Sequence, residues 1–373
     1  MTTKPRGLYI HIPFCVKKCN YCDFCSFGED TLSWRKEYIA ALCRELKRYK
    51  DDDISLDTIF FGGGTPSLLT IDEIDIIFSK INECFLVLPG TEITLEANPK
   101  TLTEEKIDHF ISKGVNRLSI GLQSIHENEQ KKLGRIHNYE DFVLTYDMAR
   151  RLGLKNINID LMYGIPAQTM ESFRKTLESV VELEPEHISL YGLILEEGTP
   201  FFNMKDTLVF PEEDMECDMY YAATDFLREK GYVHYEISNY SKVGFSSRHN
   251  LKYWHSEEYI GVGVSAYSYY LKHRYGNSRS IDEYLLGNFA QYNNGELIDS
   301  DAEAYEFVML SLRLAEGFSL TEYKRKFGVD FITGREEIVN RFLKSGHLKI
   351  NNDRLYLTES GLYISNHILT ELL

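Results

Sequence analysis

Four cysteines stand within eleven residues near the start of the chain: Cys15, Cys19, Cys22 and Cys25. The first three have the spacing C-x3-C-x2-C, which places three thiolates on one short loop. Three protein ligands on a [4Fe–4S] cube leave one iron free to bind something else. The spacing therefore predicts an iron–sulfur cluster held by Cys15, Cys19 and Cys22, with one open coordination position.

Two other uses of these thiols stay open at this point. A four-cysteine zinc site tolerates short spacings, but structural zinc usually draws on two separated pairs, and no CxxC occurs elsewhere in the sequence. Cys22 and Cys25 also fit a thioredoxin-like redox pair, which leaves Cys15 and Cys19 without a role. We favour the cluster over both alternatives for these reasons.

A glycine-rich segment, FFGGGTP at residues 60–66, follows the second predicted strand. Glycines remove Cβ atoms where backbone approaches a ligand, and exposed N–H groups can hold a carboxylate or an amine-bearing ligand. Such a run is nearly as typical of a plain tight turn. Its position at the same end of the sheet as the cysteine loop favours a ligand site.

Polar side chains also stand near the carboxyl ends of three successive predicted strands, at Glu96, Gln123 and Asp160. Side chains at this position point to the mouth of a barrel, where they can bind an amine, ribose hydroxyls or a base. Arg135 offers a planar guanidinium for a carboxylate. Any one of them could cap a helix or lie on the surface, but three in successive strands favour a site.

The elements that must position these residues alternate between apolar strands and amphipathic helices. The strands are predicted at residues 7–12, 57–61, 92–97, 117–122, 156–163 and 187–193. Six β-α units in series imply a parallel sheet with right-handed crossovers, short of the eight units of a complete TIM barrel. We expect an α/β fold with a partial, curved (β/α)6 TIM-like barrel, whose ligands collect at the carboxyl ends of the strands.

Three regions follow from the composition along the chain. Residues 1–203 carry the partial barrel. Residues 204–300 are rich in aromatics, Gly and Ser, and we predict strands and loops that extend the sheet and cover the barrel mouth. Residues 301–373 have three helical stretches, a hairpin and a last helix, which resembles a winged helix. With 11 acidic and 9 basic residues, a net charge of −2, this region favours a packing or partner role over DNA binding.

Composition excludes several classes of function. The 373 residues are 43% hydrophobic, as in a globular protein. A net charge of −16 argues against a nucleic-acid partner. The sequence contains no apolar run of membrane-spanning length and no signal-peptide pattern near its start, so we expect a cytoplasmic protein with reduced thiols. Cys43, Cys84 and Cys217 are then interpreted as structural thiols.

The motifs together resemble the radical S-adenosylmethionine (radical SAM) superfamily. Within it, the chain is similar to the branch of oxygen-independent coproporphyrinogen III oxidase, and most similar to the HemW haem chaperones. The resemblance spans about residues 7–270 and rests on YIHIPFCVKKCNYCDF, FFGGGTPSLL, LEANP, RLSIGLQS, LGRIHN, NIDLMYGIP, HISLYGLILEEGTPF, YEISNYS, RHNLKYW and GVGVSAYS.

The resemblance implies a residue for each part of the cofactor site. Cys15, Cys19 and Cys22 would hold the [4Fe–4S] cluster, and S-adenosylmethionine would bind its open iron. Residues matching the site of that molecule are Tyr9, Gly63, Glu96 and Tyr267. A second S-adenosylmethionine binds nearby in the oxidase, and the matching residues are Tyr21, Gly64, Thr65, Gln123, Arg135 and Asp160. Cleavage of the cofactor would give a 5′-deoxyadenosyl radical, which the barrel would shield.

The segment HNLKYW resembles the HNxxYW motif that marks the chaperones and is linked with haem binding. His249 or Cys25 would then serve as the axial ligand of haem, with Tyr253 and Trp254 stacking on the macrocycle. A hydrogen-bonded packing role for His249 is an equal alternative. The resemblance implies a chaperone that delivers haem to apo-haemoproteins.

A radical SAM enzyme acting on a tetrapyrrole is the alternative, either a coproporphyrinogen III dehydrogenase or a haem-degrading methyltransferase. The oxidase pattern continues Cys-x-Cys after the third ligand, whereas Phe24 fills that place here and the fourth thiol is Cys25. This departure argues against porphyrinogen oxidation. A zinc-stabilised interaction protein is a third hypothesis, and whether the chain is an enzyme at all stays open.

Overall fold

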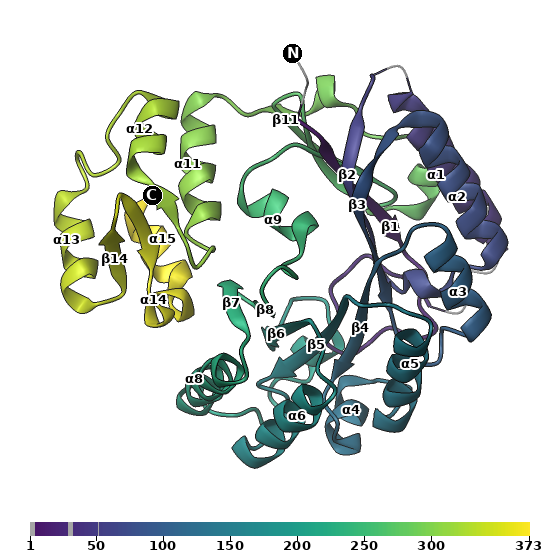
Figure 1. Cartoon of the computed structure of the whole chain (residues 1–373), viewed down its shortest axis with the longest axis horizontal. Helices are drawn as coiled ribbons and strands as arrows, with labels where there is room; N and C mark the ends of the chain where they lie inside the picture. Colours follow the sequence, from purple (N-terminus) through teal and green to yellow (C-terminus); the bar gives the residue numbers. More distant parts are fainter. Residues whose placement is uncertain (1–3, 29–32, 51) are drawn as a thin grey trace.

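A computed structural model describes residues 4–28, 33–50 and 52–373 of the chain. Six strands form the middle of its main sheet: β1 (Arg6–Ile12), β2 (Ser55–Gly63), β3 (Leu86–Ala97), β4 (Arg117–Gln123), β5 (Ile157–Tyr163) and β6 (His187–Gly192). They pair in chain order, each parallel to the next. The sheet curves into a partial barrel (Figure 1), which confirms the predicted fold class.

Helices cover the convex face of this sheet (Figure 1). They are α1 (Arg35–Leu46), α2 (Ile71–Cys84), α3 (Glu104–Ser112), α4 (Glu127–Leu133), α5 (Tyr139–Arg151) and α6 (Met170–Glu182). The helix α2 begins at a capping box, in which Thr70 and Glu73 satisfy each other's backbone N–H groups. Alternation along β1 buries Leu8, Ile10 and Ile12 in the core under the helices. Tyr9 and His11 therefore face the concave side.

Residues 204–300 extend the sheet at both edges. β8 (Asn239–Ser241) and β7 (Val233–Glu236) follow β6, whereas β9 (Tyr259–Val262), β10 (Tyr267–Tyr270), β11 (His273–Gly276) and β12 (Glu296–Leu297) follow β1. The prediction of strands and loops alone was wrong for part of this region, because it also contains the helices α8 (Glu213–Glu229), α9 (Arg248–Trp254) and α10 (Ile281–Leu285). The helix α8 buries one stripe of side chains, among them Met219, Ala223 and Leu227.

The helix α9 contains the HNLKYW segment and stands inside the curve of the sheet (Figure 1). The expectation that residues 204–300 cover the barrel mouth is therefore wrong for α9, which contacts the amino-terminal half of β2. Two anchors explain its position: Ser247 caps it by accepting from the Asn250 N–H, and the buried Glu92 carboxylate accepts from the N–H groups of Arg248 and His249.

The C-terminal region has its own apolar core. Its elements are α11 (Ser300–Ser311), β13 (Phe318–Ser319), α12 (Leu320–Phe327), α13 (Glu336–Ser345), β14 (Leu348–Asn351), β15 (Arg354–Leu357), α14 (Glu359–Tyr363) and α15 (Ser365–Leu372). The predicted hairpin is present, and the predicted last helix is divided in two after Tyr363.

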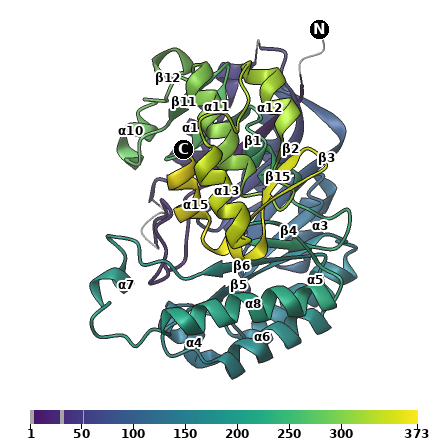
Figure 2. The ribbon, with the colours of Figure 1, turned by 90° about the vertical axis from the view of Figure 1, so that its left-hand side faces the viewer.

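This region lies against the open side of the barrel (Figures 1 and 2). Arg274 on β11 pairs with Glu306 on α11, while the ring of Tyr220 on α8 contacts Tyr363 with centroids 5.1 Å apart. The C-terminal region thus joins the two edges of the sheet, which is a packing role. Among the helices that the structure describes, none is long and apolar enough to cross a membrane.

Candidate functional site

The cysteine loop follows β1 at the mouth of the barrel and is held at both ends and in the middle. The Cys15 N–H donates to the carbonyl of Phe27 at 2.8 Å. In the middle, the Asn20 N–H donates to the carbonyl of Leu133 at 2.9 Å, and the Asn20 carbonyl accepts from the Phe201 N–H at 3.0 Å. A contact between the two ends of the loop and contacts to two distant parts of the chain therefore position the thiols.

The thiols of Cys15, Cys19 and Cys22 are partly exposed on this loop. The Cys15 sulfur lies 3.6 Å from Thr65 Oγ1, and the Cys19 sulfur lies 3.9 Å from Nη1 of Arg135. Burial raises the pKa of both Cys15 and Cys22, which keeps these thiols protonated until a metal displaces the protons.

The donor set of three neighbouring thiols fits an iron–sulfur cluster. In residues 4–28, 33–50 and 52–373, no three His, Cys, Asp or Glu side chains converge as ligands of a single metal ion. Cluster ligands do not need to converge in this way, because each thiolate binds a different iron. Cys25 is separated from the three, is buried, and has its sulfur 3.7 Å from the carbonyl of Arg279.

The glycines after β2 approach the chain itself, which corrects the expectation that they leave N–H groups free for a ligand. A Cβ on Gly64 would lie 2.7 Å from the Phe14 carbonyl, and one on Gly63 would meet the His11 ring at 2.6 Å. Their N–H groups are also used, by Glu96 at 3.1 Å and by the Ile12 carbonyl at 2.8 Å. The glycines thus let the β2 loop pack against the start of the cysteine loop.

The three polar residues at the strand ends differ in their surroundings. Burial, and then the charge of Asp160, raises the pKa of Glu96 to about 8. Burial also raises the pKa of Asp160, whose carboxylate accepts from Asn158 at 2.7 Å. Gln123 has a φ of 71° and a buried Oε1 without a hydrogen-bond partner. A strained backbone with an unsatisfied amide is typical of a ligand site.

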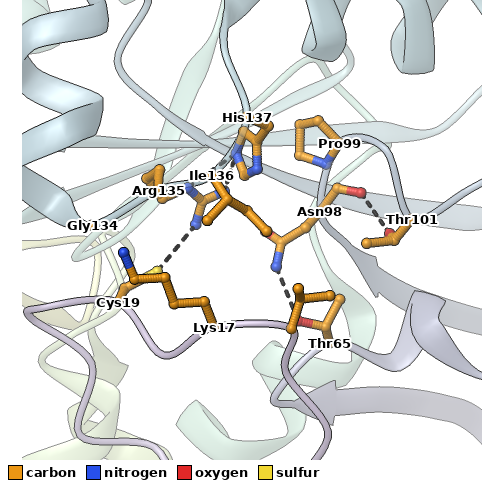
Figure 3. Close-up of a pocket in the computed structure, with 11 residues that line it drawn as sticks. Lys17, Cys19, Thr65, Asn98, Pro99, Thr101, Gly134, Arg135, Ile136 and His137 are labelled. Atoms are coloured by element: carbon orange, nitrogen blue, oxygen red, sulfur yellow. Dashed lines mark hydrogen bonds between the residues drawn. The ribbon is translucent and has the colours of Figure 1, made fainter. Parts of the chain in front are cut away.

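Arg135 lines a small cavity of about 30 Å³ on one side of the cysteine loop (Figure 3). Its guanidinium donates to Asn98 Oδ1 at 2.9 Å, to the Gly121 carbonyl, and to His137 Nε2 at 3.0 Å from Nε. Burial and the charge of Arg135 lower the pKa of His137 to about 3. The fork that the sequence predicted for a carboxylate is therefore largely occupied by protein acceptors, with Nη1 directed toward Cys19.

An open groove of about 410 Å³ lies on the other side of the loop. Four tyrosines line it, together with one cation, one thiol and the exposed ring of Phe24: Tyr9, His11, Asp23, Phe24, Cys25, Tyr253, Tyr259, Ser265, Ala266, Tyr267 and Arg279. Phe24 is 69% exposed and Tyr267 is 59% exposed, so apolar surface is available for a ligand to cover. We call this cavity the aromatic groove.

The four residues that the sequence predicted to bind haem do not all lie at the groove. Cys25 and Tyr253 line the aromatic groove. His249 is 1% exposed and lies behind Tyr253, and Trp254 lies toward Glu236 on another side of α9. Tyr9 and Tyr267 line the same groove, whereas Tyr21 packs in an apolar cluster with Leu133 and Phe201.

Sequence reasoning missed several residues around these cavities. Asn98 and His137 hold Arg135, and Arg279 is the cation of the aromatic groove. Arg117 is 2% exposed on the concave face, and in the described ranges its side chain has no hydrogen bond or ion pair. The sequence gives no specific signal for Arg117, because a charged residue at the start of a strand is equally common on a protein surface.

Known proteins share this fold and much of this sequence pattern. The family model described as "Radical SAM superfamily" matches residues 9–180, and the model described as "HemN C-terminal domain" matches residues 298–364. Coproporphyrinogen III oxidase (HemN) from Escherichia coli has the same fold, with a TM-score of 0.87 and 22% identity over 99% of this chain and 90% of that chain. The chain is thus a radical SAM protein.

Relatives of higher identity define the family more narrowly. The protein named "Heme chaperone HemW" from Lactococcus lactis subsp. lactis (strain IL1403) is 35% identical over 100% of this chain and 98% of its own length. The proteins of that name from Escherichia coli (strain K12) and Bacillus subtilis (strain 168) are 33% and 32% identical, over 98% and 97% of this chain and 97% and 98% of their own lengths. The chain belongs to the HemW family.

Proposed function

We propose that the protein binds a [4Fe–4S] cluster through Cys15, Cys19 and Cys22, and S-adenosylmethionine at its open iron. The neighbouring thiols at the barrel mouth support this assignment. Glu96, Tyr9 and Gly63 lie together near the cluster loop and would hold the cationic ligand, while Thr65 and Arg135 border the loop on its other side. When bound, the reduced cluster supplies one electron to S-adenosylmethionine.

We further propose that the protein binds haem and delivers it to apo-haemoproteins, as a cytoplasmic chaperone. The observation that carries this proposal is the aromatic groove, whose volume is within the range of small-molecule sites. Its tyrosines provide flat apolar walls for a macrocycle. Arg279 is 64% exposed at its side chain and would pair with a propionate. The names of the relatives support the same cargo.

A haemin titration of the full chain tests this function. We expect a shift of the Soret band that saturates at one haem per chain, both before and after anaerobic reconstitution of the cluster. Haem-loaded protein should then restore the absorption spectrum of an apo-haemoprotein in a transfer assay. Absence of haem binding in both forms would refute the chaperone function.

An enzyme acting on a tetrapyrrole is the competing function, because Thr65 and Arg135, which match the second cofactor site of the oxidase, both line the cavity beside the cysteine loop. Reduced, cluster-loaded protein would then convert coproporphyrinogen III or haem and form 5′-deoxyadenosine in proportion. Mass spectrometry of the porphyrin separates the two functions. We expect unchanged porphyrin and only slow, substrate-independent cleavage of the cofactor.

A further inference from the structure

Tyr253 stands between the aromatic groove and the imidazole of His249. The two residues lie one turn apart on α9, so their side chains meet. Tyr253 lines the groove and is partly exposed, whereas His249 is 1% exposed. The Tyr253 hydroxyl lies 2.7 Å from His249 Nε2. A ligand in the groove therefore meets Tyr253 before it meets His249.

The remaining sides of His249 are enclosed by the sheet. Nδ1 lies 2.8 Å from the hydroxyl of Thr58, and the ring packs on Phe60 with centroids 5.3 Å apart. A Cβ on Gly7 would stand 3.2 Å from His249 Cε1. Both ring nitrogens are thus engaged, and the ring has no free face toward the groove.

The helix that carries the pair is firmly anchored. Glu92 accepts from two N–H groups at its start, and buried Lys252 pairs with Asp57 at 2.9 Å and with Glu257 at 3.1 Å. Turning His249 toward the groove would break several of these contacts at once. The arrangement therefore favours a ligand contact made by Tyr253.

The surroundings limit where the protons of the pair lie. Burial lowers the pKa of His249 to about 3, with smaller contributions from Lys252 and Arg117, so the ring is neutral and has one N–H. Burial raises the pKa of Tyr253 well above its usual value. Two arrangements satisfy both bonds: His249 donates from Nδ1 to Thr58 while the Tyr253 hydroxyl donates to Nε2, or Thr58 donates to Nδ1 while Nε2 donates to the Tyr253 oxygen.

We propose that the phenolic oxygen of Tyr253 is the protein ligand of ferric haem iron, and that neutral His249 donates to this oxygen from Nε2. This proposal rests on haem binding in the aromatic groove. The Fe–O bond to Tyr253 forms, the bond from iron to the hydroxide of ferric haemin breaks, and the phenolic proton leaves with that hydroxide as water, so no electron is transferred. Thr58 then donates to Nδ1, so no bond partner of His249 changes.

Phenolate is a known type of haem ligand, and a hydrogen-bonded partner behind a ligand commonly tunes a metal site. The assignment reverses the roles that the sequence predicted, in which His249 binds iron and Tyr253 stacks on the macrocycle. In the structure, the tyrosine faces the groove and the histidine is its hydrogen-bond partner.

Two other tyrosine–histidine pairs in the structure differ from this one. Tyr9 and His11 also line the groove, and the Tyr9 hydroxyl bonds to His11 Nδ1 at 3.0 Å, but this hydroxyl would stand 3.2 Å from a Cβ on Gly62, so it packs against the sheet. The Tyr235 hydroxyl lies 2.8 Å from His187 Nε2, away from the groove, and it also accepts from the Ser247 N–H at the start of α9. Tyr235→Phe is therefore a matched control, since it removes a similar hydroxyl and also perturbs α9.

The test compares ferric haem complexes of the full chain and three variants by absorption, EPR and resonance Raman spectroscopy. We expect phenolate vibrations and a high-spin ferric signal in the unmodified protein and in Tyr235→Phe. Tyr253→Phe should lose the phenolate vibrations and bind haemin more weakly. His249→Gln should keep them with an affinity lowered about 10- to 100-fold, the range for a partner behind a metal ligand.

Three outcomes would overturn the assignment. Unchanged phenolate vibrations in Tyr253→Phe would place the ligand elsewhere. Tighter haemin binding in Tyr253→Phe, with an imidazole-ligated spectrum, would show that His249 is the ligand and that Tyr253 only blocks it. Absence of haem binding in the unmodified protein would refute the proposed function itself, which separates that failure from an error in the ligand.

Discussion

The two cavities beside the cysteine loop differ in size and in how far their polar groups are satisfied. The cavity next to Cys19 measures about 30 Å³, and its Arg135 is held by protein acceptors. The aromatic groove next to Cys25 measures about 410 Å³, and its Arg279 is mostly exposed while it donates to Asp23 on the same loop. The difference indicates that one side of the loop is a preorganised polar shell, whereas the other is an open surface for a large flat ligand.

The largest effect that separates the two cavities is expected from Cys19→Ser. This change removes the one of the three proposed cluster ligands that lies next to Arg135, so the variant should not retain a [4Fe–4S] cluster after anaerobic reconstitution. Haemin affinity should stay unchanged, because Cys19 does not line the aromatic groove. Iron and sulfide analysis and EPR measure the cluster, and haemin titration measures haem binding. Cys217→Ser on α8 is the control. Loss of both the cluster and haemin binding in Cys19→Ser would show that the two cavities are not independent.

Replacing the two arginines should give opposite results. Arg135→Leu leaves Asn98 Oδ1 and the Gly121 carbonyl without their buried donor, so we expect the free energy of unfolding to fall by about 3 kcal/mol. Arg279→Leu removes an exposed cation and should change stability by less than about 0.5 kcal/mol, while weakening haemin binding. Chemical denaturation and haemin titration of both variants test the contrast. Equal destabilisation by the two changes would contradict it.

Glu96 lies on the concave face, and its titration should appear in the stability of the protein. Its pKa is about 8 in the folded protein, against 4.5 for an unburied carboxyl. The folded state therefore binds this proton more tightly, and the free energy of unfolding falls by a few kcal/mol as pH rises between these values. Asp160 adds to the shift, while the Gly63 N–H and Arg117 oppose it.

Glu96→Gln should remove this loss and make the protein more stable than the unmodified chain above pH 8. Denaturant titrations across this pH range measure the effect. Glu83→Gln is the control, because the pKa of that exposed carboxyl is lowered to about 2. Glu83 therefore does not titrate in the pH range of this experiment. Parallel stability curves for Glu96→Gln and the unmodified protein would disprove the assignment.

The fold was largely predictable because its signals are local. Each strand from β1 to β6 is a short apolar run, and α2 has its capping box in the sequence. The helix α8 was missed because its aromatic-rich sequence resembles the strands around it. The helix α9 was missed because its anchor, Glu92, lies more than a hundred residues away in the chain.

The candidate site also has one part that the sequence predicts and another part that depends on residues distant in the chain. The cysteine spacing and the polar residues at the strand ends follow from sequence position along a parallel sheet. The order of His249 and Tyr253 relative to the groove depends on how α9 packs on β2, and periodicity does not contain that information. The hydrogen bonds of the Arg135 guanidinium likewise depend on Asn98 and His137, which come from separate loops.

The smallest effect that tests the groove side is expected from Thr58→Val. This near-isosteric change removes the hydroxyl that lies 2.8 Å from His249 Nδ1. We expect a loss of about 1 kcal/mol in the free energy of unfolding and a modest weakening of haemin binding, because the His249 tautomer that donates to the Tyr253 oxygen would lose the hydroxyl that donates to its Nδ1.

Thr94→Val is the matched control for this change. Thr94 is also fully buried on the same face, but its hydroxyl has no hydrogen-bond partner in the described structure. Removing an unsatisfied buried hydroxyl is neutral or stabilising, so the two threonines should respond with opposite signs in chemical denaturation. Equal responses would mean that the hydroxyl of Thr58 does not hold His249, and the proton arrangement behind Tyr253 would lose its support.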